Sequence, residues 1–478
     1  MFEQYGLYID GSWRPAADGA VRKVFDPATE ELLGTIPAAT VEDLDAALAA
    51  AQRGLKIWRG TNPWERGAKI RKAADLIRER VQEIAALMSA ETGKPLAEAV
   101  AETNASADQF EWYAEETKRI YGQTIEGRTP DVRMSVVYQP VGVVAAFSAW
   151  NFPALLPARK IAAALGAGCA IIIKPAGEAP GSCMALIQAC HDAGIPAGVV
   201  NFVCGDSSLI APYLIGSPVV RKVSLTGSVQ VGQEILRLAA AGVKKVTMEL
   251  GGHGPVLVFD DADVEAAARG CAATKFRNCG QVCISPSRFF VHERVYDEFA
   301  AVFAEVANGL KVGRGHEEGV QMGPMANARG LITAKEMIQD AVDRGAELLA
   351  GGGTPPGLDR GFFLQQTVLG HIADDARIML EEPFAPVAPI TSFQSLDEVL
   401  ERANALPFGL AGYIFTSSLR NAHVAAESLE CGMVGVNEML LATAEAPFGG
   451  IKESGMGREG GSLGIKDYLE PKYIKMKL

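Results

Sequence analysis

Three side chains in this sequence have types that suit covalent chemistry. Cys283 offers a thiol nucleophile, and Glu249, at the end of an apolar run, offers a carboxylate that can manage protons or activate water. Asn151 offers a neutral amide donor, which can stabilise an oxyanion without quenching a nucleophile. Each type also has an ordinary alternative role: a core thiol, a strand-end carboxylate, and a turn or helix-cap amide. The residue types alone therefore nominate a nucleophile, a base and an oxyanion donor.

The surrounding sequence alternates between short apolar runs and segments of helical length. The apolar runs cover residues 141–147, 170–173, 198–203, 219–225 and 243–248. This alternation predicts parallel βαβ units, whose strands are covered on both faces. A second series runs from residue 255 to about residue 435. We therefore expect an α/β fold with two parallel-sheet domains joined near Glu249, and a cleft between domains is a common ligand site.

Length and composition exclude several classes of partner. The 478 residues exceed one ordinary core, so two or more domains are expected. The net charge of −12 disfavours nucleic acid or an anionic membrane as the main partner. The sequence has no long uncharged apolar run, and its first residues lack a basic and an apolar region, so neither a membrane span nor a signal peptide is expected. Its eight cysteines lack Cys-x-x-Cys spacing, and no histidine cluster accompanies them, which predicts reduced thiols in a cytoplasmic protein without a metal site.

The better candidate for a nucleotide site lies where residues 225–232 follow an apolar run and begin a helix with Gly227 and Ser228. Free N–H groups and the helix dipole at such a start suit a pyrophosphate, and a simple capped turn is the alternative. The literal glycine pattern at residues 455–460 follows no apolar strand, so it is rejected as a dinucleotide turn. Lys174 ends another strand, either at the ligand-binding edge of the sheet or as a solvated strand end.

Taken together and in order along the chain, these motifs resemble those of the aldehyde dehydrogenase superfamily, and most closely its succinate-semialdehyde dehydrogenase branch. The resemblance covers essentially the whole chain, with Ala149, Leu225 and Ala385 departing from the usual Pro, Phe and Gly. It implies NAD(P)-dependent oxidation of an aldehyde to a carboxylic acid through a thioester. In that scheme Cys283 attacks the aldehyde and Glu249 activates the hydrolytic water, while Asn151 holds the oxyanion.

The same resemblance implies a set of residues that contact NAD or NADP. They are Trp150, Lys174, Gly227, Ser228, Leu250, Glu382 and Phe384. Lys174 is expected at the adenosine ribose, and Glu382 and Phe384 at the nicotinamide end. An acidic residue that often binds the ribose hydroxyls in the superfamily is replaced by Gly177, with Glu178 next to it. The loss of that carboxylate makes use of NADP plausible.

The resemblance also implies a substrate with a distal carboxylate. Arginines at the positions of Arg159 and Arg288 bind this carboxylate in the succinate-semialdehyde branch, a task that suits the planar guanidinium. The alternative for each is a structural ion pair. An assisting serine appears here as Ala442, beside Thr443, which leaves a longer or aromatic aldehyde open. A CoA-acylating dehydrogenase is disfavoured by Glu249, and a non-catalytic binding or structural protein on this fold is the remaining alternative.

Two segments, residues 123–141 and 462–478, fit neither βαβ series. In the superfamily they form a small β arm for oligomerisation, so a homodimer or homotetramer is expected. The predicted fold is therefore two Rossmann-like domains and an arm. Residues 1–122 and 142–250 are assigned to the NAD(P)-binding domain, and residues 251–461 to the catalytic domain.

Overall fold

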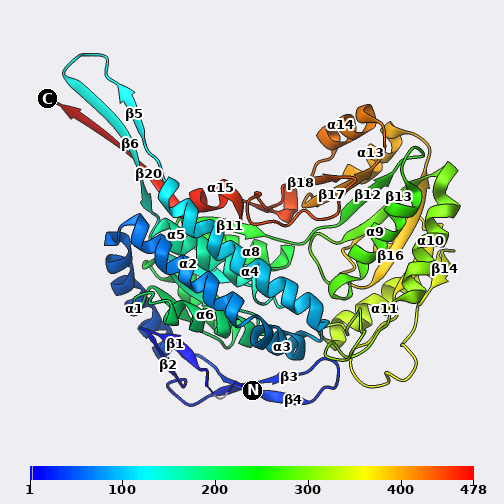
Figure 1. Ribbon diagram of the computed structural model, residues 1–478, viewed down its shortest axis with the longest axis horizontal. Helices are drawn as coiled ribbons and strands as arrows, with labels where there is room; N and C mark the ends of the chain where they lie inside the picture. Colours follow the sequence, from blue (N-terminus) through cyan, green and yellow to red (C-terminus); the bar gives the residue numbers. More distant parts are fainter. Residues whose placement is uncertain (3) are drawn as a thin grey trace.

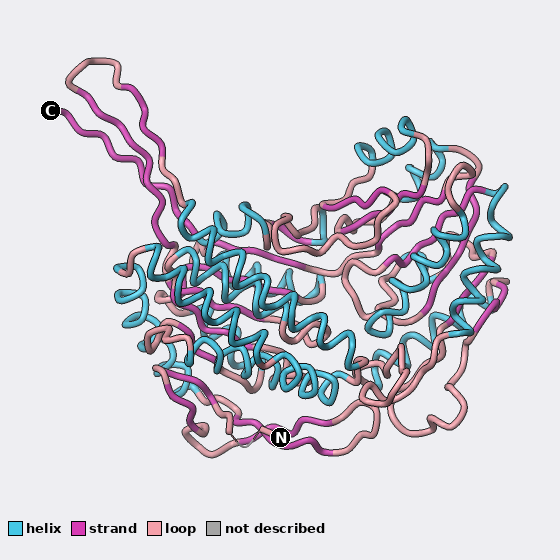
Figure 2. The backbone as a smooth tube through the Cα atoms, viewed as in Figure 1, coloured by secondary structure: helices cyan, strands magenta, loops and turns pink. Residues whose placement is uncertain are grey.

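The computed structural model describes residues 1–2 and 4–478 and consists of two α/β domains with a projecting arm (Figure 1). Both domains contain a largely parallel sheet flanked by helices, as Figure 2 shows. The expected fold class, two Rossmann-like domains and a small β arm, is confirmed. None of the helices described is long and apolar enough to cross a membrane.

The first domain is built on an eight-stranded sheet. In spatial order its strands are β19 (Gly455–Met456), β11 (Lys245–Glu249), β10 (Val220–Thr226), β7 (Val143–Phe147), β8 (Ala170–Lys174), β9 (Val200–Phe202), β1 (Leu7–Ile9) and β2 (Ser12–Arg14). The five strands from β11 to β9 are parallel, and the outer strands are antiparallel to their neighbours. Strands β7 and β8 are buried along their whole length, which explains their unbroken apolar sequences.

Helices cover both faces of this sheet. They are α1 (Val41–Gly60), α2 (Pro63–Glu79), α3 (Val81–Thr92), α4 (Leu96–Glu116), α5 (Leu155–Ala167), α6 (Gly181–Asp192), α7 (Ser207–Gly216) and α8 (Val229–Ala240), with a 3-10 turn η1 (Thr117–Arg119) after α4. Alternate residues of β7 enter different cores, because side chains on a strand point to opposite faces. Val144 and Ala146 join one apolar cluster, whereas Val143 and Ala145 join the other.

The second domain contains a seven-stranded sheet over a single large core. Its strands, in spatial order, are β14 (Glu347–Ala350), β15 (Thr367–Gly370), β16 (Val387–Phe393), β13 (Pro286–His292), β12 (Gly254–Val258), β17 (Ala411–Phe415) and β18 (Met433–Val436). All of these strands are parallel except β14. The flanking helices are α9 (Val264–Phe276), η2 (Arg277–Gly280), η3 (Glu293–Val295), α10 (Tyr296–Gly309), α11 (Ala328–Asp343), α12 (Arg377–Leu380), α13 (Leu396–Asn404) and α14 (Leu419–Ser428).

The arm is a three-stranded antiparallel sheet that extends away from the first domain (Figure 1). It contains β5 (Gln123–Glu126), β6 (Val132–Pro140) and β20 (Leu469–Lys477), and β20 pairs with β6 along its full length. Every residue of β5 is exposed, and most of β20 is exposed too. The arm therefore presents a largely uncovered sheet.

The domain boundary predicted at residue 461 is corrected by the pairing of β19. This strand lies next to β11 in the first sheet, so the chain returns to the first domain before residue 461. The short elements around it are η4 (Lys452–Ser454), α15 (Gly461–Gly464) and η5 (Ile465–Tyr468). Ile465 and Tyr468 belong to the first domain's core, so the C-terminal strand of the arm begins at Leu469 rather than at residue 462.

A two-stranded hairpin, β3 (Val21–Phe25) and β4 (Leu32–Pro37), lies along one edge of the molecule, at the bottom of Figure 1, where it borders both domains. Its connecting segment is bonded to the second domain, where the Phe362 N–H donates to the Pro27 carbonyl at 3.0 Å. The neighbouring Arg360 forms an ion pair with Glu31. The N-terminal hairpin is therefore fixed to both halves of the chain.

Candidate active site

The segment that links the two domains brings Glu249 next to Cys283. Glu249 is the last residue of β11, and residues 250–253, which include two glycines, lead from it into β12. A Cβ atom on Gly252 would lie only 2.7 Å from the carbonyl oxygen of Cys283. A side chain at this position would therefore displace the cysteine segment. The two motifs predicted to act together are in direct contact.

The cysteine segment follows α9 through a short turn in a strained conformation. Asn278 and Cys279 have φ angles of 48° and 55°, in the left-handed region that residues with side chains rarely adopt. The turn is held by the Asn278 amide, whose Nδ2 donates to the carbonyls of Asn151 at 2.9 Å and Gln281 at 3.1 Å. The Tyr413 hydroxyl also donates to the Ile284 carbonyl at 2.6 Å. These contacts fix the backbone on both sides of Cys283.

Asn151 is 4% exposed and lies against the same segment. Its Nδ2 donates to the Gln281 carbonyl at 3.1 Å, two residues before Cys283. An amide nitrogen carries two hydrogens, so one remains for another acceptor. No backbone hydrogen bond involves the Cys283 N–H among the described residues. The structure thus brings Asn151 and Cys283 together, with two donors near the thiol.

A buried ion pair that sequence reasoning missed holds Asn151 in place. Lys94 and Glu102 form this pair, and each side chain is 1% exposed. Lys94 Nζ donates to the Asn151 carbonyl at 3.0 Å. Glu102 accepts from the backbone N–H groups of Ala154 and Leu155 at 3.0 and 3.1 Å. The Thr-Gly-Lys-Pro sequence around Lys94 reads only as helix punctuation, so it gave no signal for this role.

Burial raises the pKa of both members of the predicted catalytic pair. Removal from water raises the pKa of the Cys283 thiol to about 12, and the negative charges of Glu382 and Glu249 add to the shift. Burial also raises the pKa of Glu249 well above its usual value, and the carboxylate of Glu459 adds to this. Neither carboxyl oxygen of Glu249 has a hydrogen-bond partner among the described residues. Such perturbed groups are typical of catalytic sites.

A buried polar chain lies behind Glu249. Lys160, in α5, donates from Nζ to Glu459 at 2.6 Å and to the Ser224 hydroxyl at 3.1 Å. Lys160 and Glu459 are almost completely buried. Their charges act on Glu249 in opposite directions, since Lys160 lowers its pKa and Glu459 raises it. Burial is the largest cause of the raised pKa of Glu249, and this fixed pair of opposite charges modifies it.

Arg159 joins this group as a buried cation with no ion-pair partner among the described residues. It is 2% exposed, and its guanidinium carbon lies 4.0 Å from the centre of the Phe448 ring. In the described part of the chain its guanidinium forms no ion pair, and its Nε has no hydrogen-bond partner. Its positive charge lowers the pKa of both Glu249 and Cys283, so it faces both residues. Burying an unpaired positive charge costs free energy unless a bound anion neutralises that charge.

Arg288, predicted to share this role, is placed elsewhere by the structure. Its guanidinium donates to the carbonyls of His253 at 3.2 Å, Arg402 at 3.2 Å and Ala403 at 2.8 Å. It is 4% exposed, and the charges that act on it are those of Cys431 and Asp374. These bonds occupy its donors, so Arg288 holds strand β13 to neighbouring backbone. The substrate role is therefore withdrawn for Arg288.

Arg277 is the arginine that the structure places near the cysteine segment instead. It begins η2, is half-buried, and its guanidinium carbon lies 5.4 Å from the centre of the Phe152 ring. Its charge acts on Tyr413, which also faces Cys283. No ion pair of Arg277 occurs among the described residues. Its position six residues before Cys283 was the available signal, and it was overlooked in favour of Arg288.

The predicted adenosine end of the cofactor site is a cavity at the carboxyl edge of the first sheet. Its volume is about 260 Å³, and its lining includes Phe147, Lys174, Gly177, Leu225, Gly227 and Ile235. Lys174 Nζ donates to the Pro175 carbonyl at 3.2 Å, and burial lowers the pKa of this lysine. Ser228 caps α8 by accepting from the Val231 N–H at 3.4 Å. Apolar walls, a cation and a helix start fit a dinucleotide.

Glu382, another predicted cofactor residue, lies against the segment that links the two domains. A Cβ on Gly251 would approach Glu382 to 2.5 Å, and the Gly252 N–H donates to Glu382 at 3.2 Å. Burial raises the pKa of the Glu382 carboxyl to about 8. The rings of Trp150 and Phe384 meet edge to face with centres 5.6 Å apart.

Leu250 and Lys275 complete the surroundings of this end. Leu250 is buried, and its side chain packs so closely on α8 that a Cβ on Gly232 would approach it to 2.5 Å. Lys275 is completely buried without a hydrogen-bond partner among the described residues, and burial lowers its pKa to about 7. The negative charge of Glu382 raises the pKa of Lys275 and so opposes the effect of burial, which places the Lys275 and Glu382 side chains near each other. Sequence reasoning did not single out Lys275.

A model of the aldehyde dehydrogenase family matches residues 13–474. The chain belongs to this family. The described residues contain no group of three or more His, Cys, Asp or Glu side chains placed to hold a metal ion.

Similar members of the aldehyde dehydrogenase family include two semialdehyde dehydrogenases. The chain is 44% identical to a glutarate-semialdehyde dehydrogenase of Pseudomonas putida, covering 99% of this chain and 98% of the relative. It is 42% identical to the NADP(+) succinate-semialdehyde dehydrogenase of Escherichia coli K12, with the same coverage. The crystal structure of a succinate-semialdehyde dehydrogenase from Burkholderia pseudomallei superposes with a TM-score of 0.97 at 43% identity, covering 99% of this chain and 98% of that one. The predicted family and class of enzyme are confirmed.

Proposed function

We propose that this aldehyde dehydrogenase oxidises a semialdehyde with a distal carboxylate to the dicarboxylate. The observation that carries the proposal is Arg159, a buried guanidinium that forms no ion pair among the described residues and faces both Cys283 and Glu249. A bound carboxylate would complete this charge through charge-assisted hydrogen bonds. The similarity to glutarate- and succinate-semialdehyde dehydrogenases supports the same substrate class.

Cys283 is the proposed nucleophile, and its activation requires loss of a proton. The thiolate is the reactive form, whereas burial favours the thiol. Arg159 and a backbone hydrogen bond from Ile284 both lower the pKa of the thiol, which opposes burial. The raised pKa of Glu249 makes its carboxylate a stronger proton acceptor, which suits a general base.

Asn151 and the Cys283 N–H are the proposed oxyanion donors. Attack by sulfur on the aldehyde carbon moves negative charge onto the carbonyl oxygen. The Asn151 amide is hydrogen-bonded to the segment that carries Cys283, and its second hydrogen and the Cys283 N–H are the donors that this arrangement offers. Loss of one such donor typically costs about 10²–10³ in rate. The Lys94–Glu102 pair that holds Asn151 supports this geometry.

A nicotinamide dinucleotide is the proposed cofactor, held by the residues from Lys174 and Gly227 to Glu382 and Phe384. When bound, the nicotinamide supplies the two-electron oxidant for the aldehyde carbon. Glu249 then takes a proton from the water that hydrolyses the thioester on Cys283. A carboxylic acid leaves, and the thiol is restored.

The arm is proposed to join copies of the chain into a dimer or tetramer. It extends from the first domain and exposes apolar side chains such as Ile125, Tyr473 and Met476. An exposed sheet of this kind is a surface for pairing with another chain. Sedimentation of the purified protein tests this proposal, and a monomer at micromolar concentration would contradict it.

The substrate proposal is tested with a panel of aldehydes of similar length, with and without a distal carboxylate. We expect kcat/KM to be higher for the carboxylated members with either cofactor. A guanidinium–carboxylate contact contributes about 1.5–3 kcal/mol, which is about a 10- to 150-fold preference. Equal values for charged and uncharged aldehydes would contradict the proposal. Dependence of turnover on CoA would instead favour an acylating dehydrogenase.

A further inference from the structure

Arg22, on the N-terminal hairpin, reaches into the cavity at the carboxyl edge of the first sheet. It belongs to β3, outside the βαβ units, yet it lines the same cavity as Lys174 and Gly227. A Cβ built on Gly177 would lie 2.9 Å from its Nε atom and 3.0 Å from its guanidinium carbon. The guanidinium therefore occupies the space above Gly177 that a side chain at this position would need.

The charge of Arg22 is not neutralised by a specific partner. Arg22 is exposed, and it forms no ion pair or side-chain hydrogen bond among the described residues. The charged groups that share its surroundings are Lys174, Glu178 and Asp206. Glu178 and Asp206 are both exposed, and Asp206 accepts from the N–H and hydroxyl of Ser208. Arg22 and Lys174 are thus two cations at one wall of the cavity.

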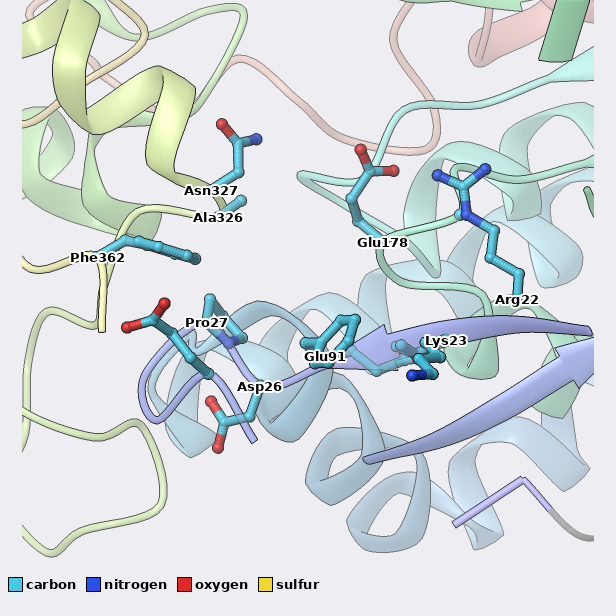
Figure 3. A pocket seen from close by; sticks show the side chains of 13 residues that line it. Arg22, Lys23, Asp26, Pro27, Glu91, Glu178, Ala326, Asn327 and Phe362 are labelled. Carbon is cyan, nitrogen blue, oxygen red and sulfur yellow. The ribbon is translucent and has the colours of Figure 1, made fainter. Parts of the chain in front are cut away.

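Figure 3 shows where this arginine comes from. The Arg22 side chain rises from β3 toward the loop that carries Glu178, whereas Lys23, the next residue on the strand, does not follow it. Successive side chains of a strand point to opposite faces, which explains the difference. Lys23 carries the same charge as Arg22, lies on the same strand and is also exposed, so it is a matched control.

We propose that Arg22, together with Lys174, binds the 2′-phosphate of NADP and makes the hairpin a determinant of cofactor choice. The proposal rests on the proposed nicotinamide-dependent function. A planar guanidinium suits a phosphate because two N–H groups can meet two oxygens. Gly177 contributes by leaving room for the Arg22 guanidinium, and a carboxylate side chain there would both displace the guanidinium and repel the phosphate.

The test measures binding of adenosine fragments that differ by one phosphate. Isothermal titration calorimetry compares 2′,5′-ADP with 5′-ADP for the wild type, Arg22→Gln and Lys23→Gln. We expect Arg22→Gln to weaken the binding of 2′,5′-ADP by about tenfold or more, because one charged hydrogen bond is lost. The affinity for 5′-ADP should stay within about twofold of the wild-type value. Lys23→Gln should change neither. These fragments contain no nicotinamide, so the readout does not depend on catalysis.

A second variant tests the role of the free space. Gly177→Ala leaves every charge in place but moves the Arg22 guanidinium, so it should also weaken 2′,5′-ADP selectively. Equal weakening of both fragments by Arg22→Gln, or no change in either, would overturn the proposal. The same holds if Lys23→Gln reproduces the effect of Arg22→Gln.

The kinetic measurement separates this proposal from the proposed function. If the wild type oxidises aldehydes but Arg22→Gln leaves the ratio of kcat/KM for NADP and NAD unchanged, the role of Arg22 fails alone. If no aldehyde is oxidised while 2′,5′-ADP binding still depends on Arg22, the proposed reaction fails and the phosphate site stands.

Discussion

Replacing Arg159 with methionine should separate substrate recognition from catalysis. The side chain is 2% exposed, stacks on Phe448 at 4.0 Å, and has no ion pair among the described residues. Methionine keeps a flexible apolar stem that can pack against the ring. The change therefore removes a positive charge and little else. Arg277→Met is the companion variant, because this arginine is half-buried near the segment that carries Cys283.

The magnitude follows from the contacts that the charge would make. Each charged hydrogen bond lost to the substrate carboxylate costs about 1.5–3 kcal/mol, or about 10- to 150-fold in kcat/KM. An uncharged aldehyde makes no such bond, so the substitution should lower kcat/KM for this aldehyde far less. A smaller loss on both substrates is expected because the Arg159 charge also lowers the pKa of the Cys283 thiol. The assay is reduced-cofactor formation with a semialdehyde and an uncharged aldehyde of equal length.

Stability provides an independent check on this reasoning. A buried cation without a partner destabilises the free protein, so removing it should not lower the melting temperature. A clear fall in melting temperature for Arg159→Met, together with equal kinetic losses on both aldehydes, would refute the argument. That result would mean that Arg159 holds the structure rather than the substrate.

Three further predictions test the surrounding groups. Arg288→Met should lower the melting temperature and impair both aldehydes equally, because it removes donors to three buried carbonyls; selective loss of the semialdehyde would restore its substrate role. Alkylation of Cys283 by iodoacetamide, followed by mass spectrometry, should rise by about tenfold per pH unit through pH 9, because burial raises the pKa of this thiol to about 12; a plateau below pH 9 would contradict this. Glu459→Gln should shift the pH dependence of kcat to lower pH, because the Glu459 charge raises the pKa of Glu249; an unchanged profile would contradict it.

The fold was largely predictable from the sequence because parallel strands buried on both faces leave unbroken apolar runs. The run at residues 170–173 became β8, which is wholly buried. The boundary at residue 461 failed because β19 has only two residues, and its pairing with β11 is a long-range contact. A two-residue strand has no periodicity from which to predict it.

The site was predictable where a motif carries a chemical residue type, as at Glu249 and Cys283, whose segments touch. Roles that depend on which way a side chain points were harder. Arg288 follows the cysteine closely, but strand β13 directs it to backbone carbonyls. The Lys94–Glu102 pair was missed because its contact with Asn151 spans distant parts of the chain. Sequence spacing gives no information on such contacts.

The most direct test of the account is rapid-mixing measurement of cofactor reduction by Glu249→Gln, with Cys283→Ala beside it. If Cys283 forms a thioester and Glu249 activates the water that hydrolyses it, Glu249→Gln should give a burst of reduced cofactor equal to the enzyme, followed by slow turnover. Cys283→Ala should give neither burst nor turnover. Substantial aldehyde oxidation by Cys283→Ala, or wild-type steady-state turnover by Glu249→Gln, would contradict the account.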